Sequence, residues 1–229
     1  MAAKNCKMDA NEKSKDTEEP FQKVTYKKNH SSTTNKRGRK SKKSITIVGD
    51  SIIKDIKNHL PTFDNAKVTV NSYPGATTQQ LYTYTQSFDL NKPDAIIIHI
   101  GTNDLTMNEN DAEVADNIIN FATYLNGKYD VAVIISSLTY RIDFKYKHSR
   151  RIKAVNDALK SRCENLDLGY IENDNIKKYY LGSGGVLLNK EGSAMLTYNF
   201  ERVINILNFN NNKGKQQSTR NNKKKSQGR

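Results

Sequence analysis

Short apolar runs alternate with amphipathic stretches from residue 44 to residue 210, and this alternation limits the fold more than any other feature of the chain. Five short runs that read as strands lie at residues 45–48, 67–72, 95–100, 131–137 and 168–172. Patterns typical of helices lie between and after them, at residues 52–60, 77–87, 111–126, 149–165 and 190–208. Because strands that alternate with helices form right-handed βαβ units, the sequence predicts one α/β domain. The expected domain has three layers, α/β/α, and its middle layer is a flavodoxin-like sheet of five parallel strands.

The net charge of +13 is concentrated at the two ends of the chain. Residues 1–43 hold 13 Lys and Arg against 5 Asp and Glu, and residues 211–229 hold 7 against none. Residues 44–210 hold 17 against 19, so this part is slightly acidic. Both terminal segments lack the apolar periodicity that offsets chain entropy. We therefore expect a folded domain at 44–210 between two disordered basic tails.

The tails contain two clusters of basic residues that suit contact with a polyanion. The clusters are Lys36, Arg37, Arg39, Lys40, Lys42 and Lys43, and Lys223, Lys224 and Lys225. Such clusters release counterions when they neutralise phosphates, which makes RNA or DNA a candidate partner. The alternative is a solvated run of charge that keeps the protein soluble.

Several classes of protein are disfavoured by what the sequence lacks. No apolar run approaches the roughly 18 residues of a membrane span, and no apolar stretch follows the first methionine. Two cysteines, Cys6 and Cys163, show no paired or metal-ligand spacing. We therefore expect an intracellular protein, nuclear or cytoplasmic and not secreted, without membrane, metal or cofactor. Nothing in the sequence indicates an oligomeric state.

A serine lies at the end of the first predicted strand, in the run Gly49-Asp50-Ser51. A strand that turns sharply into a helix exposes this hydroxyl at the first helical turn, where backbone N–H groups favour a developing negative charge. Gly75 follows the second predicted strand and Asn103 follows the third. If these strand ends meet at one edge of the sheet, the N–H groups of Ser51 and Gly75 and the amide of Asn103 form an oxyanion hole.

The order Gly-Asp-Ser, Gly, Gly-Thr-Asn-Asp resembles the SGNH (GDSL-type) hydrolase superfamily, over roughly residues 44–210. The resemblance implies an esterase fold, with Ser51 at the position of the nucleophile. It also implies that Ser51, Gly75 and Asn103 supply the oxyanion donors. An acyl-enzyme route of this kind needs no metal or cofactor.

One block of the superfamily pattern is altered. The superfamily carries Asp-x-x-His-Leu-Asn before its last helix, where the His is the base and the Asp orients it. The aligned stretch here keeps Leu188-Asn189 but has Gly184 at the Asp position and Leu187 at the His position. A serine without a base is a poor nucleophile. We therefore expect a catalytically impaired domain that acts as a binding or scaffold module. The alternative is an active acyl-ester hydrolase in which another residue replaces the base.

Only four histidines are available to replace it. His30 lies in the N-terminal tail, His99 lies about 13 Å from Asn103 along a strand, and His59 lies about 12 Å from Ser51 along the first predicted helix. His148 is predicted in a loop at the same sheet edge as Ser51, so it is the candidate substitute base. Its other interpretation is a solvated loop histidine.

Other polar residues at this edge have a functional and a structural interpretation. Residues 140–151 combine Tyr140 and Tyr146 with five Lys or Arg against one acid, which suits an anionic ligand or a small ester at the cleft. The alternative is a surface loop whose aromatic rings pack on neighbouring helices. Asp50 is expected to organise its turn, and Asp104 to cap or brace the loop that follows Asn103.

Overall fold

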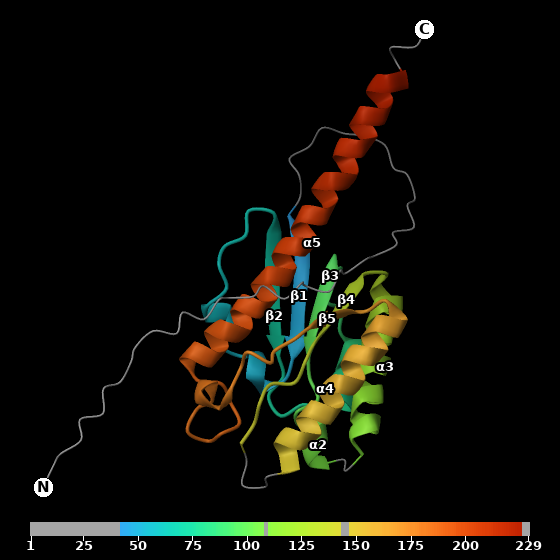
Figure 1. The fold of residues 1–229 in the computed structure, drawn as a ribbon. Coiled ribbons are helices and arrows are strands. Elements are labelled where there is room, and N and C mark those ends of the chain that lie inside the picture. Colours follow the sequence, from blue (N-terminus) through green and yellow to red (C-terminus); the bar gives the residue numbers. More distant parts are fainter. Residues whose placement is uncertain (1–41, 108–109, 143–146, 226–229) are drawn as a thin grey trace, which may run out of the picture.

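The structure, a computed structural model, describes residues 42–107, 110–142 and 147–225, and for residues 147–149 and 208–225 it describes the backbone only. Its centre is one sheet of five parallel strands in the order β2-β1-β3-β4-β5 (Figure 1). The strands are β1 Lys43–Gly49, β2 Ala66–Ser72, β3 Ala95–His99, β4 Ala132–Ser136 and β5 Gly169–Ile171. This order and the parallel pairing confirm the predicted flavodoxin-like α/β fold.

Helices cover both faces of the sheet (Figure 1). The α-helices are α1 Thr78–Ser87, α2 Asp104–Met107, α3 Asp111–Tyr129, α4 Lys147–Leu166 and α5 Lys190–Lys225. The short 3-10 helices are η1 Ser51–Ile53, η2 Ile56–Asn58 and η3 Lys178–Tyr180. One face carries α1, α3 and α4, and the other carries α5 with η1 and η2, as their shared apolar clusters show.

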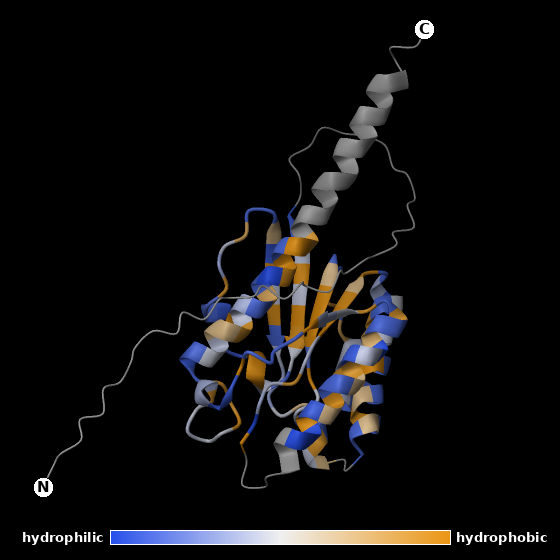
Figure 2. Cartoon of the chain, in the orientation of Figure 1, coloured by the Kyte–Doolittle hydropathy of each residue, from blue (hydrophilic) through white to orange (hydrophobic). Residues whose placement is uncertain are grey.

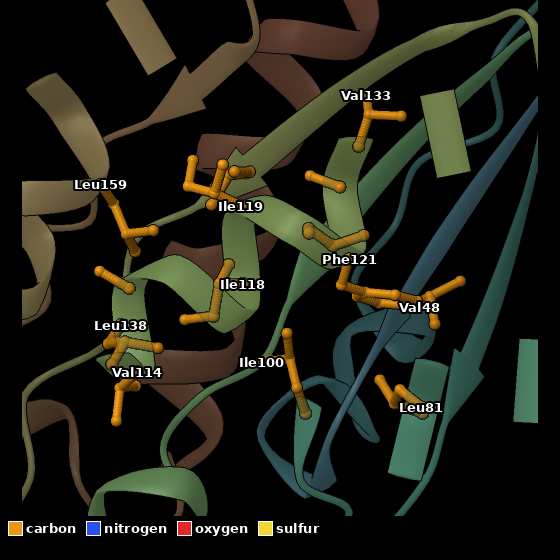
Figure 3. Packing of buried hydrophobic residues seen from close by; sticks show 14 of the residues in the cluster. Val48, Leu81, Ile100, Val114, Ile118, Ile119, Phe121, Val133, Leu138 and Leu159 are labelled. Atoms are coloured by element: carbon orange, nitrogen blue, oxygen red, sulfur yellow. The ribbon is translucent and has the colours of Figure 1, made fainter. Parts of the chain in front are cut away.

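The alternation of side chains along the strands creates two apolar clusters, one on each face of the sheet. Val48, Ile96 and Ile98 contact the layer of α1, α3 and α4, and Figure 3 shows the packing of this cluster. Ile47 and Ile97 point the other way, toward α5. Figure 2 shows the consequence, since the strands are strongly hydrophobic and the outer helices are mixed. Burial on both faces explains why the inner strands β3 and β4 are almost entirely apolar, whereas the edge strand β2 alternates apolar and polar residues.

The prediction of a helix at residues 52–60 is wrong. The structure has two short 3-10 helices there, closed by hydrogen bonds such as Lys54 N–H to Ser51 C=O and Asn58 N–H to Asp55 C=O. The segment ends before Pro61 and is shorter than an α-helix that is stable alone. Burial of its isoleucines against α5 therefore decides its conformation.

At the N-terminal ends of the strands, the start of β1 lies next to α5. The chain enters β1 at Lys43, at the N-terminal edge, and the Lys43 ammonium group donates a hydrogen bond to the Leu207 carbonyl of α5. The helix α5 continues past that edge to Lys225, beyond the predicted domain boundary at residue 210 (Figure 1). Residues 1–41 lie outside the described residues, so the predicted disorder of the N-terminal tail stays a prediction. The backbone of α5 is described through Lys225, and the predicted disorder of residues 211–229 stays a prediction as well.

Candidate active site

Three turns meet at the C-terminal edge of the sheet. Gly49, the last residue of β1, pairs with the last residue of β2 on one side and of β3 on the other. Ser51 lies two residues after the end of β1, Gly75 lies three residues after the end of β2, and Asn103 lies four residues after the end of β3. At about 3.3 Å per residue, all three lie within a few residues' length of the same point. This point is also where the strand order reverses, the usual ligand site of such sheets.

A hydrogen bond links two of these turns across the third. The Asn103 side-chain Nδ2 donates to the Ala76 carbonyl over 2.9 Å. Asn103 follows β3 and Ala76 follows β2, while β1 lies between these strands. The contact therefore passes over the end of β1, where the Ser51 turn begins. The geometry brings the three predicted positions, Ser51, Gly75 and Asn103, to one place.

The candidate oxyanion donors are available for a ligand. Within the described part of the chain, neither the Ser51 N–H nor the Gly75 N–H donates to a protein acceptor. Asn103 Nδ2 uses one of its two hydrogens on Ala76. Gly75 is exposed and has φ +76°, a left-handed conformation that glycine adopts without strain. The arrangement can stabilise a negatively charged oxygen in front of the Ser51 turn.

Asp50 organises this turn, as the sequence predicts. It is the N-cap of η1, and its Oδ1 accepts a hydrogen bond of 2.9 Å from the Ile52 N–H. The residue is 1% exposed. Its pKa is raised to about 7, chiefly by burial. The hydrogen bond from the Ile52 N–H lowers this pKa, the Asp104 carboxylate raises it, and the Arg141 guanidinium lowers it. Asp50 is thus partly protonated at neutral pH, which limits the negative charge beside Ser51.

Asp104 fixes the loop that carries Gly75. Both carboxylate oxygens of Asp104 accept from the Thr78 N–H at 3.1 Å, so this residue of α2 caps the start of α1. Burial raises the pKa of Asp104, while the hydrogen bond from the Thr78 backbone lowers it. Asn103 and Asp104 together hold the loop at Ala76 and Thr78. The expected bracing role of Asp104 is therefore exerted on α1.

The segment before α5 forms a small antiparallel turn at the same edge. Leu181 pairs with Leu188, and both pack in the apolar cluster that includes Ile52 and Ile53 of η1. A Cβ added to Gly184 would meet no atom within 4 Å, and Leu187 is 36% exposed. The side chain of Asn189, the residue before α5, accepts from the Gly192 N–H over 2.7 Å. The retained Leu-Asn pair thus has a structural use, and the two altered positions lie at the surface.

No histidine side chain that the structure describes contacts Ser51. The Ser51 hydroxyl has no hydrogen-bond partner there. His99 is fully buried under the sheet edge with its Nδ1 2.9 Å from Ser136 Oγ, and burial lowers its pKa to about 4. His59 ends η2. His148 lies in the first turn of α4, not in the predicted loop, and its side chain lies outside the described atoms, as does His30 entirely.

The predicted aromatic and basic rim is only partly described. Tyr140 packs against the apolar cluster beneath α5, which favours its structural interpretation. Arg141 lies near Asp50 and donates to the Thr102 carbonyl over 3.4 Å. Ile142 N–H donates to the Gly185 carbonyl, so this segment contacts the turn before α5. Tyr146 lies outside the described residues.

Two arrangements were not found by sequence reasoning. Arg141 beside Asp50 is one, although five basic residues in its loop were a signal. The other is a buried polar chain in which Asn173 Nδ2 donates to Ser136 Oγ over 2.8 Å and Asn199 Nδ2 donates to Asn173 Oδ1 over 2.9 Å. Its members are far apart in sequence, so only the fold reveals it.

Residues 47–195 match the sequence profile of the GDSL-like Lipase/Acylhydrolase family, and they make up more than half of the chain. The chain belongs to this family. The match includes the Ser51 turn, both neighbouring strand ends and the altered turn before α5. No curated protein sequence matches the chain.

Solved structures of similar fold include esterases and lipases. A GDSL-like lipase from Bacteroides thetaiotaomicron is 18% identical with a TM-score of 0.61, over 72% of this chain and 89% of that one. The lipase/acylhydrolase from Enterococcus faecalis is 20% identical with a TM-score of 0.56, over 71% and 95%. A catalytic mutant of an acetylxylan esterase from Geobacillus stearothermophilus is 14% identical with a TM-score of 0.58, over 71% and 94%. At these identities the likeness shows the fold.

Two further classes of site were sought in the described part of the chain. Among residues 42–107, 110–142 and 147–225, no group of three or more His, Cys, Asp or Glu side chains is arranged to hold a metal ion. No helix among the described residues is long and apolar enough to cross a membrane.

Proposed function

We propose that this GDSL-like protein is catalytically impaired and binds a small anionic ligand at the Ser51 edge of the sheet. The observation that carries the proposal is the Ser51 hydroxyl, which has no hydrogen-bond partner among the described side chains. A hydroxyl needs a base within about 3 Å to attack an ester. Gly184 and Leu187, at the positions of the family's acid and base, offer neither.

The remaining donors support binding of a carboxylate or a similar anion. The N–H groups of Ser51 and Gly75 and the second hydrogen of Asn103 Nδ2 have no described acceptor. Donors that stabilise an oxyanion in a transition state also stabilise a stable anion of similar shape. A site that keeps its donors and lacks its base therefore retains binding and loses chemistry.

A working ester hydrolase is the alternative, favoured by the free donors and by the position of His148. The first turn of α4 follows β4 at the same edge of the sheet as Ser51. In this alternative His148 takes the Ser51 proton, the serine oxygen bonds to the acyl carbon, and the alcohol leaves with a proton. Water then hydrolyses the acyl-enzyme.

One assay separates the two functions. The full chain, Ser51→Ala and His148→Ala are compared for turnover of an activated acetate ester. We expect equal rates in all three, because no base activates the serine. Turnover that is well above buffer and is lost in Ser51→Ala would reject impairment, and its loss in His148→Ala would identify the base. Binding of acetate to the inactive protein, weakened by Asn103→Ala, is the second expected result.

We also propose that the basic segments bind a polyanion such as RNA or DNA, as a scaffold separate from the cleft. The N-terminal cluster ends at Lys43, which contacts Leu207 of α5 at the N-terminal edge of the sheet. The C-terminal cluster follows on the same helix. Both clusters are thus joined to the edge opposite Ser51, which supports binding of two ligands at once.

The salt dependence of RNA binding tests this second proposal. Each lost phosphate contact to single-stranded RNA should reduce the slope of log K against log salt by about 0.7. We expect this reduction when Lys36, Arg37, Arg39 and Lys40 become Gln, and again when Lys223, Lys224 and Lys225 do. The matched control changes Lys153 and Lys160 of α4 to Gln. An unchanged slope in the cluster variants would contradict the proposal.

A further inference from the structure

A cavity lies on the face of the sheet opposite α5, between α1 and α3. Its volume is about 240 Å³. The lining residues are Thr78, Gln79, Tyr82, Asn117, Asn120, Phe121 and Tyr124. No charged side chain is among them, although 27% of the chain is charged. The cavity is therefore lined by neutral hydrogen-bonding groups and aromatic rings.

The α3 side of this groove has an unusual composition for a helix seam. Asn117, Asn120, Phe121 and Tyr124 follow helical spacing and share one stripe of α3. Apolar side chains normally fill the seam between two packed helices, and Asn is a weak helix former. Phe121 is 1% exposed and forms the floor, while both asparagines are exposed. The two asparagines contribute neither packing nor helix propensity at this seam.

The amide groups of the groove have no partner within the described protein. The side chains of Gln79, Asn117 and Asn120 make no hydrogen bond to any described residue. Each amide offers two donor hydrogens and one acceptor oxygen. Three such groups around one cavity can therefore donate to and accept from a ligand that carries neighbouring hydroxyl groups.

The walls of the groove are held in place from both ends. The rings of Tyr82 and Tyr124 contact each other across it, with centroids 4.6 Å apart. The Lys128 ammonium group hydrogen-bonds the Thr85 carbonyl at the far end of α1. At the near end, the Thr77–Gln80 capping box orders the first turn of α1. A groove with fixed walls loses little conformational entropy when it binds a ligand.

We propose that this groove binds an uncharged polyhydroxylated ligand, an oligosaccharide, independently of Ser51. Neutral amides pair with hydroxyl groups, and half-buried tyrosine rings cover the apolar faces of a sugar ring. A phosphate-bearing ligand would need a cation in the lining, and none is among the lining residues. Lys128, whose ammonium group lies 5.9 Å from the centroid of the Tyr124 ring, is hydrogen-bonded to the Thr85 carbonyl. Thr78 follows Gly75 by three residues, so the groove begins within about 11 Å of the Ser51 edge and does not include it.

The experiment uses the full chain, labelled with ¹⁵N, and a panel of neutral gluco-, manno-, xylo- and chito-oligosaccharides. The side-chain amide signals of Asn117, Asn120 and Gln79 report binding directly. We expect one saccharide to shift these signals, and Asn117→Ala with Asn120→Ala to weaken its affinity about tenfold, as loss of two neutral hydrogen bonds implies. These positions are exposed and helical, so alanine does not threaten the fold.

Two controls separate the groove from the rest of the molecule. Ser51→Ala should leave the affinity for the saccharide unchanged. This result tests the groove independently of the function proposed for the Ser51 edge. Asn205→Ala, at a half-buried asparagine of α5 across the sheet, should also have no effect on this affinity. The proposal is overturned if no neutral saccharide shifts the three amide signals, if the double variant binds as wild type does, or if only oligonucleotides shift them.

Discussion

Two buried titratable side chains should change the stability of this domain with pH in opposite directions. Replacing either side chain should therefore make the pH dependence caused by the other one visible. His99 and Asp50 lie near the same edge of the sheet, and the Asp50 N–H donates to the His99 carbonyl. His99 is 0% exposed and Asp50 is 1% exposed. Burial disfavours the charged form of both. His99 becomes charged as pH falls, and Asp50 becomes charged as pH rises. The two groups therefore have opposite effects on how stability depends on pH.

The histidine contribution is lost as pH falls. The pKa of His99 is about 4 in the folded protein, against an ordinary value of 6.5 for the unfolded chain. Between these values the unfolded chain binds a proton that the folded chain does not, so the free energy of unfolding decreases as pH falls through this window. At about 1.4 kcal/mol for each pKa unit, the full loss is about 3 kcal/mol.

The aspartate contribution has the opposite sign. The pKa of Asp50 is about 7 in the folded protein, against an ordinary value of 3.8 for the unfolded chain. In that window the folded chain holds a proton that the unfolded chain releases, so the free energy of unfolding decreases as pH rises, by about 4 kcal/mol in total. From about pH 4 to pH 6.5 the two slopes nearly cancel.

The assay measures urea unfolding across that pH range for wild type, His99→Gln and Asp50→Asn. Gln keeps a hydrogen-bonding group toward Ser136, and Asn keeps an acceptor for the Ile52 N–H. Relative to wild type, His99→Gln should lose stability as pH rises from about 4.5 to about 6.5, and Asp50→Asn should gain it, each by about 2 to 3 kcal/mol. Difference curves that stay flat would refute the assignment of buried, oppositely shifted groups.

Three further predictions concern single sites. Gly184→Asp with Leu187→His should raise Ser51-dependent esterolysis by about 10²-fold or more, because the added Cβ at Gly184 meets nothing within 4 Å; a folded but inert double variant would show that the donors are misplaced. Gly127→Ala should stabilise α3 by about 1 kcal/mol, because the added Cβ has open space. Gly101→Ala should cost about 2 kcal/mol or more, because Gly101 has φ +123° and the added Cβ would lie 2.6 Å from the Ile118 side chain. Similar melting temperatures for the two variants would contradict this packing. Thr77→Ala removes the capping box of α1 and should cost about 1 kcal/mol in urea unfolding, and no change would indicate that the Asp104 contact alone holds this helix end.

The fold was predictable because its strands are buried on both faces. The first four residues of β3, Ala95 to Ile98, are all apolar, which few structures other than an inner parallel strand require. The strand-end motifs then determined which turns face one another, because parallel strands place their C-terminal ends at one edge. Ser51, Gly75 and Asn103 were predicted as site residues in this way.

Sequence reasoning failed where tertiary contacts override local pattern. Residues 52–60 carry isoleucines at helical spacing, yet contact with α5 and the following proline leave only 3-10 turns. The chain of His99, Ser136, Asn173 and Asn199 depends on four separate elements, and no spacing in the sequence announces it. The neutral groove between α1 and α3 is likewise a product of helix packing.

The contact between Lys43 and Leu207 has a practical consequence for handling the protein. Lys43 and Leu207 lie at the pole opposite Ser51, so a surface linkage made directly beside either residue would be remote from the serine. Immobilised in this way, every molecule would present the Ser51 pole to the solution, and that pole carries the unpaired donors.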